Sequence, residues 1–383
     1  MAGSTLGNIF KISTWGESHG KALGVVIDGC PAGLSLSEAD IQPYLDRRKP
    51  GQSRYTTPRK EDDEIEILSG VFDGKTTGTP ISMILYNTSQ HSGDYSEIAS
   101  YYRPGHADYT FDKKYGFRDY RGGGRSSGRE TAARVAAGAV AIKILKELGI
   151  SFTTYTRSIG DIEISYDNFD ENEIMNNMLY MPDKQAADNA GRYIEEISKD
   201  HDSIGGVIEC KVSGAPAGIG DPVFEKLDAN LAKALMSIGA VKGVEIGDGI
   251  SVSRKKGSDN NDGFILCENN PDNNNSTSDN YNSSSIIKSS NHAGGILGGI
   301  SDGSDILVRA SFKATPSILK EQTTVNKNNE EINISIKGRH DPVIVPRAVV
   351  VVEAMTAITL LDALLLNMSS TLDGIKSFYT FIQ

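Results

Sequence analysis

The hydrophobic positions of the chain predict three helices. Between residues 130 and 148, apolar side chains cover more than one face of a helix, so we expect this helix to be buried. Gly149 follows it, and glycine is common just beyond a helix C-terminus. A helical stripe of leucines and alanines spans residues 227–238. Residues 348–366 are apolar enough for a long buried helix, although 349–352 could instead form a strand.

Short apolar runs predict strands elsewhere. Residues 9–28 alternate such runs with turns, which favours strands on both sides of a loop at 16–20. Ser37 suits the N-cap of a helix whose length Pro43 leaves open. The pattern as a whole indicates a mixture of α and β elements. Further strands are expected in residues 65–71, 79–86 and 306–312.

Two polar segments interrupt this pattern. Residues 258–290 are rich in Asn, Asp and Ser and poor in large apolar residues, which predicts a mobile surface insertion. The ordered chain is expected to resume at 291–295. Residues 320–331 are also polar and are interpreted as an exposed loop. Neither segment marks a domain boundary, so the prediction is one domain over residues 1–383.

Composition narrows the class of protein. Of the 383 residues, 38% are hydrophobic, which is enough for a sizeable core. Glu353 and Asp362 interrupt the longest apolar stretch, so a membrane span is not expected. The N-terminus lacks the features of a signal peptide. Three widely spaced cysteines (Cys30, Cys210 and Cys267) predict neither a disulfide framework nor a metal site. We therefore expect a cytoplasmic protein.

The charge distribution points to a small ligand. A formal net charge of −11 disfavours nucleic acid as a partner. A local basic cluster in a segment broken by Pro and Gly favours a small anion, although an ordinary solvated loop remains an alternative. The cluster consists of Arg47, Arg48, Lys49, Arg54, Arg59 and Lys60.

Four short phrases carry the candidate chemistry. Each places His, Ser, Arg or Asp beside Gly or Pro, the residues that form rigid turns and allow close backbone approach. We therefore predict one composite site for an anion. The phrases are Gly-Glu-Ser-His-Gly at 16–20, Arg-Pro-Gly-His-Ala-Asp at 103–108, a glycine-rich phrase at 122–131, and Arg-His-Asp-Pro at 339–342.

The two histidines of the first two phrases, His19 and His106, are candidates for general acids, because imidazole exchanges protons near neutral pH. The phrase at 122–131 lacks the pattern of a P-loop and of a dinucleotide fold. Its arginines and serines suit phosphate or carboxylate at the start of the predicted helix, although a helix cap with surface arginines stays open. Residues 313–317 follow a predicted strand and could hold another phosphate.

Together these phrases resemble the chorismate synthase family, from about residue 7 to about residue 366. The resemblance implies an α+β fold, a β-α-β sandwich with helices packed between antiparallel sheets, and a homotetramer. It implies a trans-1,4 elimination that converts 5-enolpyruvylshikimate 3-phosphate into chorismate and phosphate, the last step of the shikimate pathway. The family requires reduced FMN, although the reaction has no net redox change.

The resemblance also assigns roles. It makes His19 the acid that assists the departing phosphate and His106 the residue that protonates reduced flavin. Asp341 would help flavin N5 to take up the substrate proton, with Ser18 and Ser127 as hydrogen-bonding supports. The implied substrate-binding residues are Arg48, Arg54, Arg103, Arg129 and Arg339. The implied FMN-binding residues are Arg125, Ser126, Ser127, Gly239, Ala240, Gly298, Lys313, Ala314, Thr315, Pro316, Ser317 and Arg339.

One position departs from the family. Where the family usually has Asn before Ala, this chain has Gly239 before Ala240, so only a backbone contact to flavin is expected there. Arg48 and Arg54 also match positions sometimes assigned to NADP. No segment resembles a flavin reductase, so externally reduced FMN is expected, with NADPH only as an indirect reductant. The alternatives are a phosphatase or phosphotransferase without flavin, and a non-catalytic phospho-ligand-binding module. FMN-dependent turnover would distinguish them.

Overall fold

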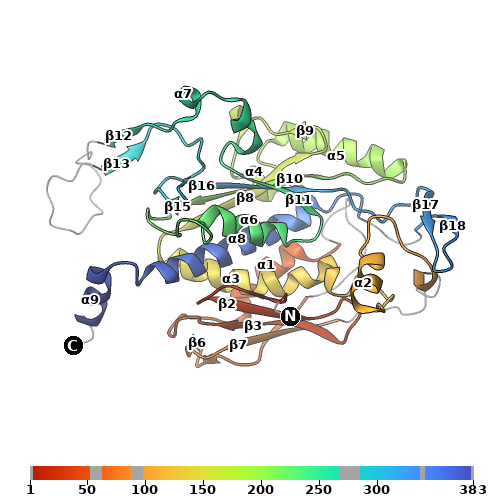
Figure 1. Ribbon diagram of the computed structural model, residues 1–383, viewed down its shortest axis with the longest axis horizontal. Helices are drawn as coiled ribbons and strands as arrows, with labels where there is room; N and C mark the ends of the chain where they lie inside the picture. Colours follow the sequence, from red (N-terminus) through yellow and green to blue (C-terminus); the bar gives the residue numbers. More distant parts are fainter. Residues whose placement is uncertain (1–2, 52–62, 88–97, 268–284, 337–340, 381–383) are drawn as a thin grey trace.

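Two antiparallel sheets enclose a layer of helices in the computed structural model of the chain, which describes residues 3–51, 63–87, 98–267, 285–336 and 341–380. Each sheet has five strands. Figure 1 shows the first sheet below the helices and the second above them. The predicted α+β sandwich, with helices packed between antiparallel sheets, is therefore confirmed.

The first sheet has the strand order β1-β2-β3-β7-β4. Adjacent strands β2 and β3 pair from Lys11↔Asp28 to Gly16↔Leu23, so the loop that joins them lies at one end of these strands. This confirms the predicted strands on both sides of the 16–20 loop. The bounds are β1 Thr5–Leu6, β2 Lys11–Gly16, β3 Ala22–Asp28, β4 Ile65–Ile67 and β7 Ile81–Tyr86, with a separate small pair, β5 Val71–Phe72 and β6 Lys75–Thr76.

The second sheet has the order β11-β16-β10-β8-β9. Its central strand β10 pairs with β8 on one side and β16 on the other, and β16 contains the strand predicted at 306–312. The long strands β8 and β10 were not predicted. The bounds are β8 Ser151–Ile159, β9 Ile162–Glu163, β10 Gly206–Ser213, β11 Val241–Ile246 and β16 Ile306–Phe312.

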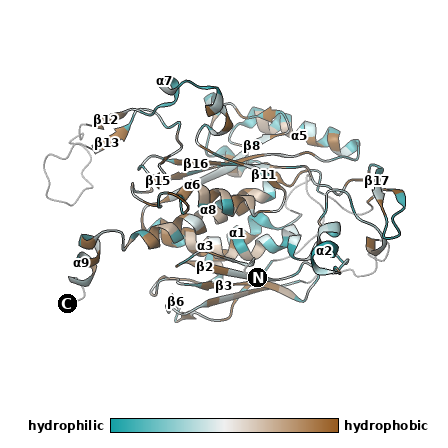
Figure 2. Ribbon diagram, viewed as in Figure 1, coloured by the Kyte–Doolittle hydropathy of each residue, from teal (hydrophilic) through white to brown (hydrophobic). Residues whose placement is uncertain are grey.

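The helical layer contains the three helices expected from the hydrophobic pattern and the helix expected after the Ser37 N-cap. The three are α3 Thr131–Glu147, α6 Leu227–Met236 and α8 Val345–Asn367, and the fourth is α1 Glu38–Arg48. Residues 349–352 are helical, which decides between the two predictions for that run. Helices α3 and α8 cross closely, because a Cβ atom on Gly138 would lie 2.2 Å from the Cβ atom of Ala354. Figure 2 shows hydrophobic residues along α8, whereas α1 carries many hydrophilic ones.

Helix α8 is long and apolar enough to cross a membrane by length and composition, but it lies in the protein core. Its two carboxylates have partners inside the protein. Glu353 forms an ion pair with Arg47. Asp362 accepts hydrogen bonds from the backbone N–H groups of Ile9 and Phe10. The helix therefore joins the first sheet to the helical layer.

Several elements lie outside the sandwich. The polar segment 320–331 was predicted to be a loop, and this was wrong, because it contains one strand of a hairpin and the start of the other. Strand β17 begins at Gln322, and the segment 100–102 pairs with the hairpin through backbone hydrogen bonds. The outer elements are α2 Asp108–Tyr115, α4 Glu173–Asn176, α5 Lys184–Lys199, β14 Ile296–Leu297, β15 Ile300–Ser301, β17 Gln322–Val325, β18 Glu331–Ile334 and α9 Leu372–Thr380.

The two ends of the predicted insertion at 258–290 form secondary structure, which we call its base. It contains most of α7 Gly257–Asn260 and the hairpin β12 Phe264–Cys267 with β13 Ser285–Lys288. At this base the buried ammonium group of Lys288 pairs with Asp262 and Asp302. Residues 268–284, on which the prediction of mobility also falls, lie outside the described residues.

Candidate active site

The first and third phrases meet beside the first sheet. The loop after β2 carries Ser18 and His19, whose Oγ and Nδ1 atoms share a hydrogen bond of 3.0 Å. Gly122 packs directly against this imidazole: a Cβ atom there would lie 2.3 Å from His19 Nδ1. Only glycine allows this approach. The glycine-rich phrase therefore forms one wall of the space around His19.

Two side chains fasten these phrases together. Arg125 donates hydrogen bonds to the backbone oxygens of Thr14 and Gly16, 3.1 Å each. Asn87, immediately after β7, donates from Nδ2 to Gly20 O and accepts from Arg129 Nε. Arg125, predicted to bind FMN, thus has a structural role at the end of β2 in this chain.

Arg48 and Arg129 converge on one carboxylate. Arg48 Nη2 lies 2.5 Å from Asp63 Oδ2, and Arg129 Nη1 pairs with the other oxygen. Burial alone would raise the pKa of Asp63, but the two guanidinium groups outweigh it and hold that pKa below its usual value. Arg48 also donates to Gly128 O, next to the start of α3. The two predicted substrate arginines are thus fixed at the N-terminal end of α3, where an anion is favoured.

The fourth phrase joins the same region through Arg347. This residue, near the start of α8, pairs with Asp341 at 2.5 Å and donates from Nε to Arg48 O at 3.1 Å. Asp341 is 7% exposed. Arg347 thereby links the predicted proton-handling carboxylate to the end of α1.

The second phrase packs against the segment after β16. His106 Nδ1–H donates to Pro104 O at 2.9 Å, which leaves Nε2 of the neutral ring to accept from Ser317 Oγ–H, also at 2.9 Å. Lys313 Nζ donates to Gly105 O. Burial lowers the pKa of His106, and the charge of Arg103 lowers it further. The neutral form of His106 is therefore favoured.

Arg103 is held by its own phrase. Its guanidinium group makes a forked pair with Asp108, at 2.8 Å from Nε and from Nη2. Burial would raise the pKa of Asp108, but hydrogen bonds from Arg103 hold it below the usual value. Because this pair lies at the start of α2, it fixes the turn that presents His106.

The predicted flavin residues of the third phrase lie close to Gly239 and Ala240, which are also predicted to bind flavin. Ser126 O lies 3.9 Å from where a Cβ atom of Gly239 would be, and Ala240 O accepts from Lys313 N at 2.9 Å. Ala240 has φ of +74°, a conformation that alanine rarely adopts and that occurs preferentially at functional sites. Within the part of the chain that the structure describes, the buried hydroxyl of Thr315 has no hydrogen-bond partner. We call Ser126, Gly239, Ala240, Lys313 and Thr315 the cradle; among them the Thr315 hydroxyl is a donor without a partner within the described residues.

Gly298 lies apart from this cradle. Its neighbour Gly299 accepts a hydrogen bond from the N–H of Leu227, the first residue of α6, whereas Gly239 follows the last turn of that helix. The ten residues of α6 span about 15 Å. The structure thus separates Gly298 from Gly239 and Ala240 within one chain. Arg54 and Arg339 lie outside the described residues.

Three residues of the site were missed from the sequence: Asp63, Asn87 and Arg347. Asp63 comes shortly before the strand predicted at 65–71, and Asn87 follows the strand predicted at 79–86. Polar residues are common at such positions, so neither residue stands out in the sequence. Their partners are far away in the sequence, so only the fold shows what they bind. Arg347 precedes the apolar run of α8, where a lone arginine looks like an ordinary helix start.

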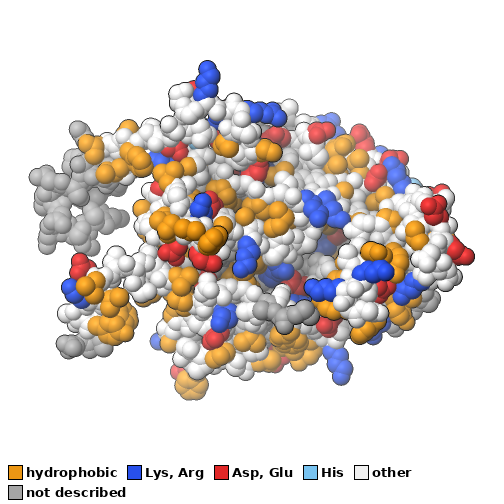
Figure 3. Space-filling model, viewed as in Figure 1, with side chains coloured by type: hydrophobic (Ala, Val, Ile, Leu, Met, Phe, Trp, Pro, Cys, Tyr) orange, Lys and Arg blue, Asp and Glu red, His pale blue; other side chains and the backbone are white. Residues whose placement is uncertain are grey.

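Figure 3 shows Lys and Arg side chains gathered on the viewed face between the two sheet layers. No group of three or more His, Cys, Asp or Glu side chains suited to a metal ion occurs in residues 3–51, 63–87, 98–267, 285–336 and 341–380. The layered fold thus gathers buried arginines and two histidines, groups that suit a small, multiply charged anion.

Comparisons with known proteins name the family. The chorismate synthase family model matches residues 10–365. The chain is 64% identical over 379 residues to a chorismate synthase of Agathobacter rectalis, with 99% of each chain covered. It is 53% identical to one of Syntrophobacter fumaroxidans, over 95% of this chain and 98% of the relative. A crystal structure of a chorismate synthase matches with a TM-score of 0.74 at 32% identity, covering 98% of both chains. The chain belongs to the chorismate synthase family and is a lyase.

Proposed function

We propose that this chain eliminates phosphate from 5-enolpyruvylshikimate 3-phosphate to give chorismate, with reduced FMN as its cofactor. One observation carries the proposal. Segments that are more than 300 residues apart in sequence, from His19 to Asp341, are tied into one network through Arg48, Arg129 and Arg347. A substrate with one phosphate and two carboxylates needs such an assembly of cations.

The cradle fits a flavin phosphate and ring. Lys313 supplies a positive charge, and the buried Thr315 hydroxyl has no hydrogen-bond partner among the described residues. Gly239 has no side chain, so it leaves backbone atoms accessible. Ser317 and Ser126 add hydroxyl groups at its edges. When bound, reduced FMN would supply an electron to the substrate and recover it, so that the reaction needs no net oxidant.

The residues around the cradle would manage binding and protons. His19, supported by Ser18, would give a proton to the oxygen that leaves with phosphate. His106 has a lowered pKa, and an anionic ligand beside it would raise that pKa and let Nε2 hold a proton. Asp341, oriented by Arg347, would assist removal of the ring proton.

The buried arginines would orient the substrate. Arg48 has a buried Nε atom without a hydrogen-bond partner among the described residues, so it can still donate to an anion. Arg129 adjoins it through Asp63. Arg103, Arg54 and Arg339 complete the proposed substrate set. Asp63 holds Arg48 and Arg129 at a fixed separation, which orders the site before substrate arrives.

Three broader features belong to the same proposal. Exposed apolar side chains on α9, such as Leu372 and Phe378, offer surface for subunit contacts in a homotetramer. Cys30 and Cys210 are free thiols, as suits a reducing cytoplasm. NADPH would act only indirectly, by keeping flavin reduced.

Anaerobic assay of 5-enolpyruvylshikimate 3-phosphate with the full chain tests the proposal. We expect chorismate and phosphate to form in equal amounts with reduced FMN and neither to form without it. Release of phosphate without FMN would favour a phosphatase instead. Binding of substrate without any turnover in the presence of reduced FMN would favour a phospho-ligand-binding module.

A further inference from the structure

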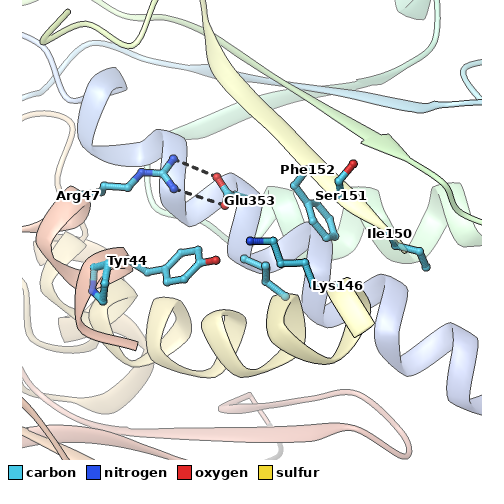
Figure 4. Close-up of a pocket in the computed structure, with 9 residues that line it drawn as sticks. Tyr44, Arg47, Lys146, Ile150, Ser151, Phe152 and Glu353 are labelled. Carbon is cyan, nitrogen blue, oxygen red and sulfur yellow. Dashed lines mark hydrogen bonds and ion pairs between the residues drawn. The ribbon is translucent and has the colours of Figure 1, made fainter. Parts of the chain in front are cut away.

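A cavity of about 310 Å³ lies on another side of α1 from Arg48. It is an open pocket bordered by α1, α3, α8 and the start of β8 (Figure 4). Nothing in the proposed reaction uses it. Its lining residues are Pro43, Tyr44, Arg47, Ile142, Lys146, Ile150, Ser151, Phe152 and Glu353.

The wall of the cavity is largely apolar. Ile142 comes from α3, while Ile150 and Phe152 come from the start of β8 and its approach. The ring of Tyr44 projects into the space from α1 (Figure 4). An apolar wall with two aromatic rings favours a ligand with a flat ring, because aromatic pairs add attraction beyond burial.

The polar groups carry one unbalanced positive charge. Arg47 and Glu353 neutralise each other through an ion pair of 3.0 Å. Burial and the charge of Glu353 raise the pKa of Tyr44, so its hydroxyl remains a donor at neutral pH. Lys146 makes no ion pair with any residue that the structure describes, and Figure 4 shows its side chain directed towards Tyr44.

Two donors face the same part of the cavity. The Lys146 side chain is directed towards Tyr44, whereas the guanidinium group of Arg47 is directed towards Glu353 (Figure 4). Tyr44 Oη and Lys146 Nζ are both donors, and one carboxylate could accept from this pair.

We propose that this cavity binds a small monocarboxylate with an aromatic body, at a site separate from the composite site. Lys146 would provide the charge that attracts the carboxylate, and Phe152 and Tyr44 would cover the ring. The substrate itself does not fit this chemistry, since it carries a phosphate and two carboxylates whereas the cavity has one surplus cation. Helix α1 thus presents adjacent residues to two sites, Arg48 to the composite site and Arg47 to the cavity.

Calorimetry on the full chain at low salt tests this, with 3-phenylpropionate as probe and 3-phenyl-1-propanol as its uncharged counterpart. Neither substrate nor FMN is present, so the outcome does not depend on the proposed function. We expect one saturable site per chain for the acid and weaker binding of the alcohol. Absence of saturable binding up to about 10 mM acid would overturn the proposal, since weaker affinity than this is non-specific.

Matched variants locate the site. Lys146→Met keeps the aliphatic stem and should weaken the acid about fivefold, the effect of an exposed ion pair of about 1 kcal/mol. Lys184→Met, at the exposed start of α5, should leave the affinity unchanged. Ser151→Trp, at an exposed position on the rim, should abolish binding with circular dichroism unaltered. Equal affinity in the wild type and both cavity variants would show that the acid binds elsewhere and would overturn the assignment.

Discussion

At the scale of single residues, Asp63 links two of the predicted substrate arginines. Its carboxylate is buried and pairs with both Arg48 and Arg129. Without Asp63 both guanidinium groups would lose this shared carboxylate. The substrate arginines therefore depend on an acidic residue that the phrases themselves do not contain.

Asp63→Asn should reduce the free energy of unfolding by roughly 3–5 kcal/mol, the usual cost of removing one partner from a buried ion pair such as Arg48–Asp63. Urea unfolding would measure it. Glu163→Gln is the matched control. Glu163 pairs with Arg157, but the Glu163 side chain is 53% exposed, and exposed ion pairs contribute less than about 1 kcal/mol. Equal losses in the two variants would contradict the role given to Asp63.

His19→Ala and His106→Ala should each lower turnover by roughly 10²–10⁴-fold, the usual effect of losing a general acid. Their folding stability should change far less. His201→Asn is a suitable control, because His201 is exposed with φ of +60°, which Asn tolerates. Normal turnover in a folded His19 or His106 variant would remove that residue from the mechanism.

The lowered pKa of His106 predicts a specific acid sensitivity. The unfolded chain has a His pKa near 6.5, so between that pH and the lower folded value the unfolded state binds more protons. The stability associated with neutral His106 is therefore present above about pH 6.5 and is lost as the pH falls. Unfolding of the ligand-free protein should be less pH-dependent in His106→Asn from about pH 6.5 to 5. Identical slopes for both proteins would refute this.

At the scale of elements, α3 and α8 position the site. Helix α3 begins at Thr131, directly after the glycine-rich phrase, and α8 begins beside Arg347 and Asp341. Their buried faces were predictable from their hydrophobic residues. Strands β8 and β10 were not, because β10 pairs with β16 across about 100 residues and this pairing depends on the tertiary structure.

The insertion provides a test at this scale. Replacing 268–284 by Asn-Gly should leave turnover and flavin binding nearly unchanged, because this polar stretch has few apolar residues to bury and the dipeptide closes a hairpin well. Lys288→Ala, at the base, should instead cost roughly 3–5 kcal/mol of stability, since it leaves two buried carboxylates without their cation. Loss of activity in a folded, shortened chain would contradict the separation of tip and base.

At the scale of the whole molecule, the two sheets and the helices between them bring the phrases together. From the sequence, the chemistry of the phrases predicted one anion site, and the family resemblance predicted the sandwich. The sequence could not indicate that Asn87 and Arg347 join the phrases, because these contacts depend on how β7 and α8 pack. It also could not separate Gly298 from Ala240, which lie at opposite ends of α6.

A structure of the full assembly with oxidised FMN and 5-enolpyruvylshikimate 3-phosphate tests the central claim most directly. We predict that the substrate lies within hydrogen-bond distance of Arg48, Arg129 and His19, with the flavin against Lys313–Ser317 and the Gly239–Ala240 backbone. A substrate bound away from these arginines, or a flavin bound away from the cradle, would contradict the account.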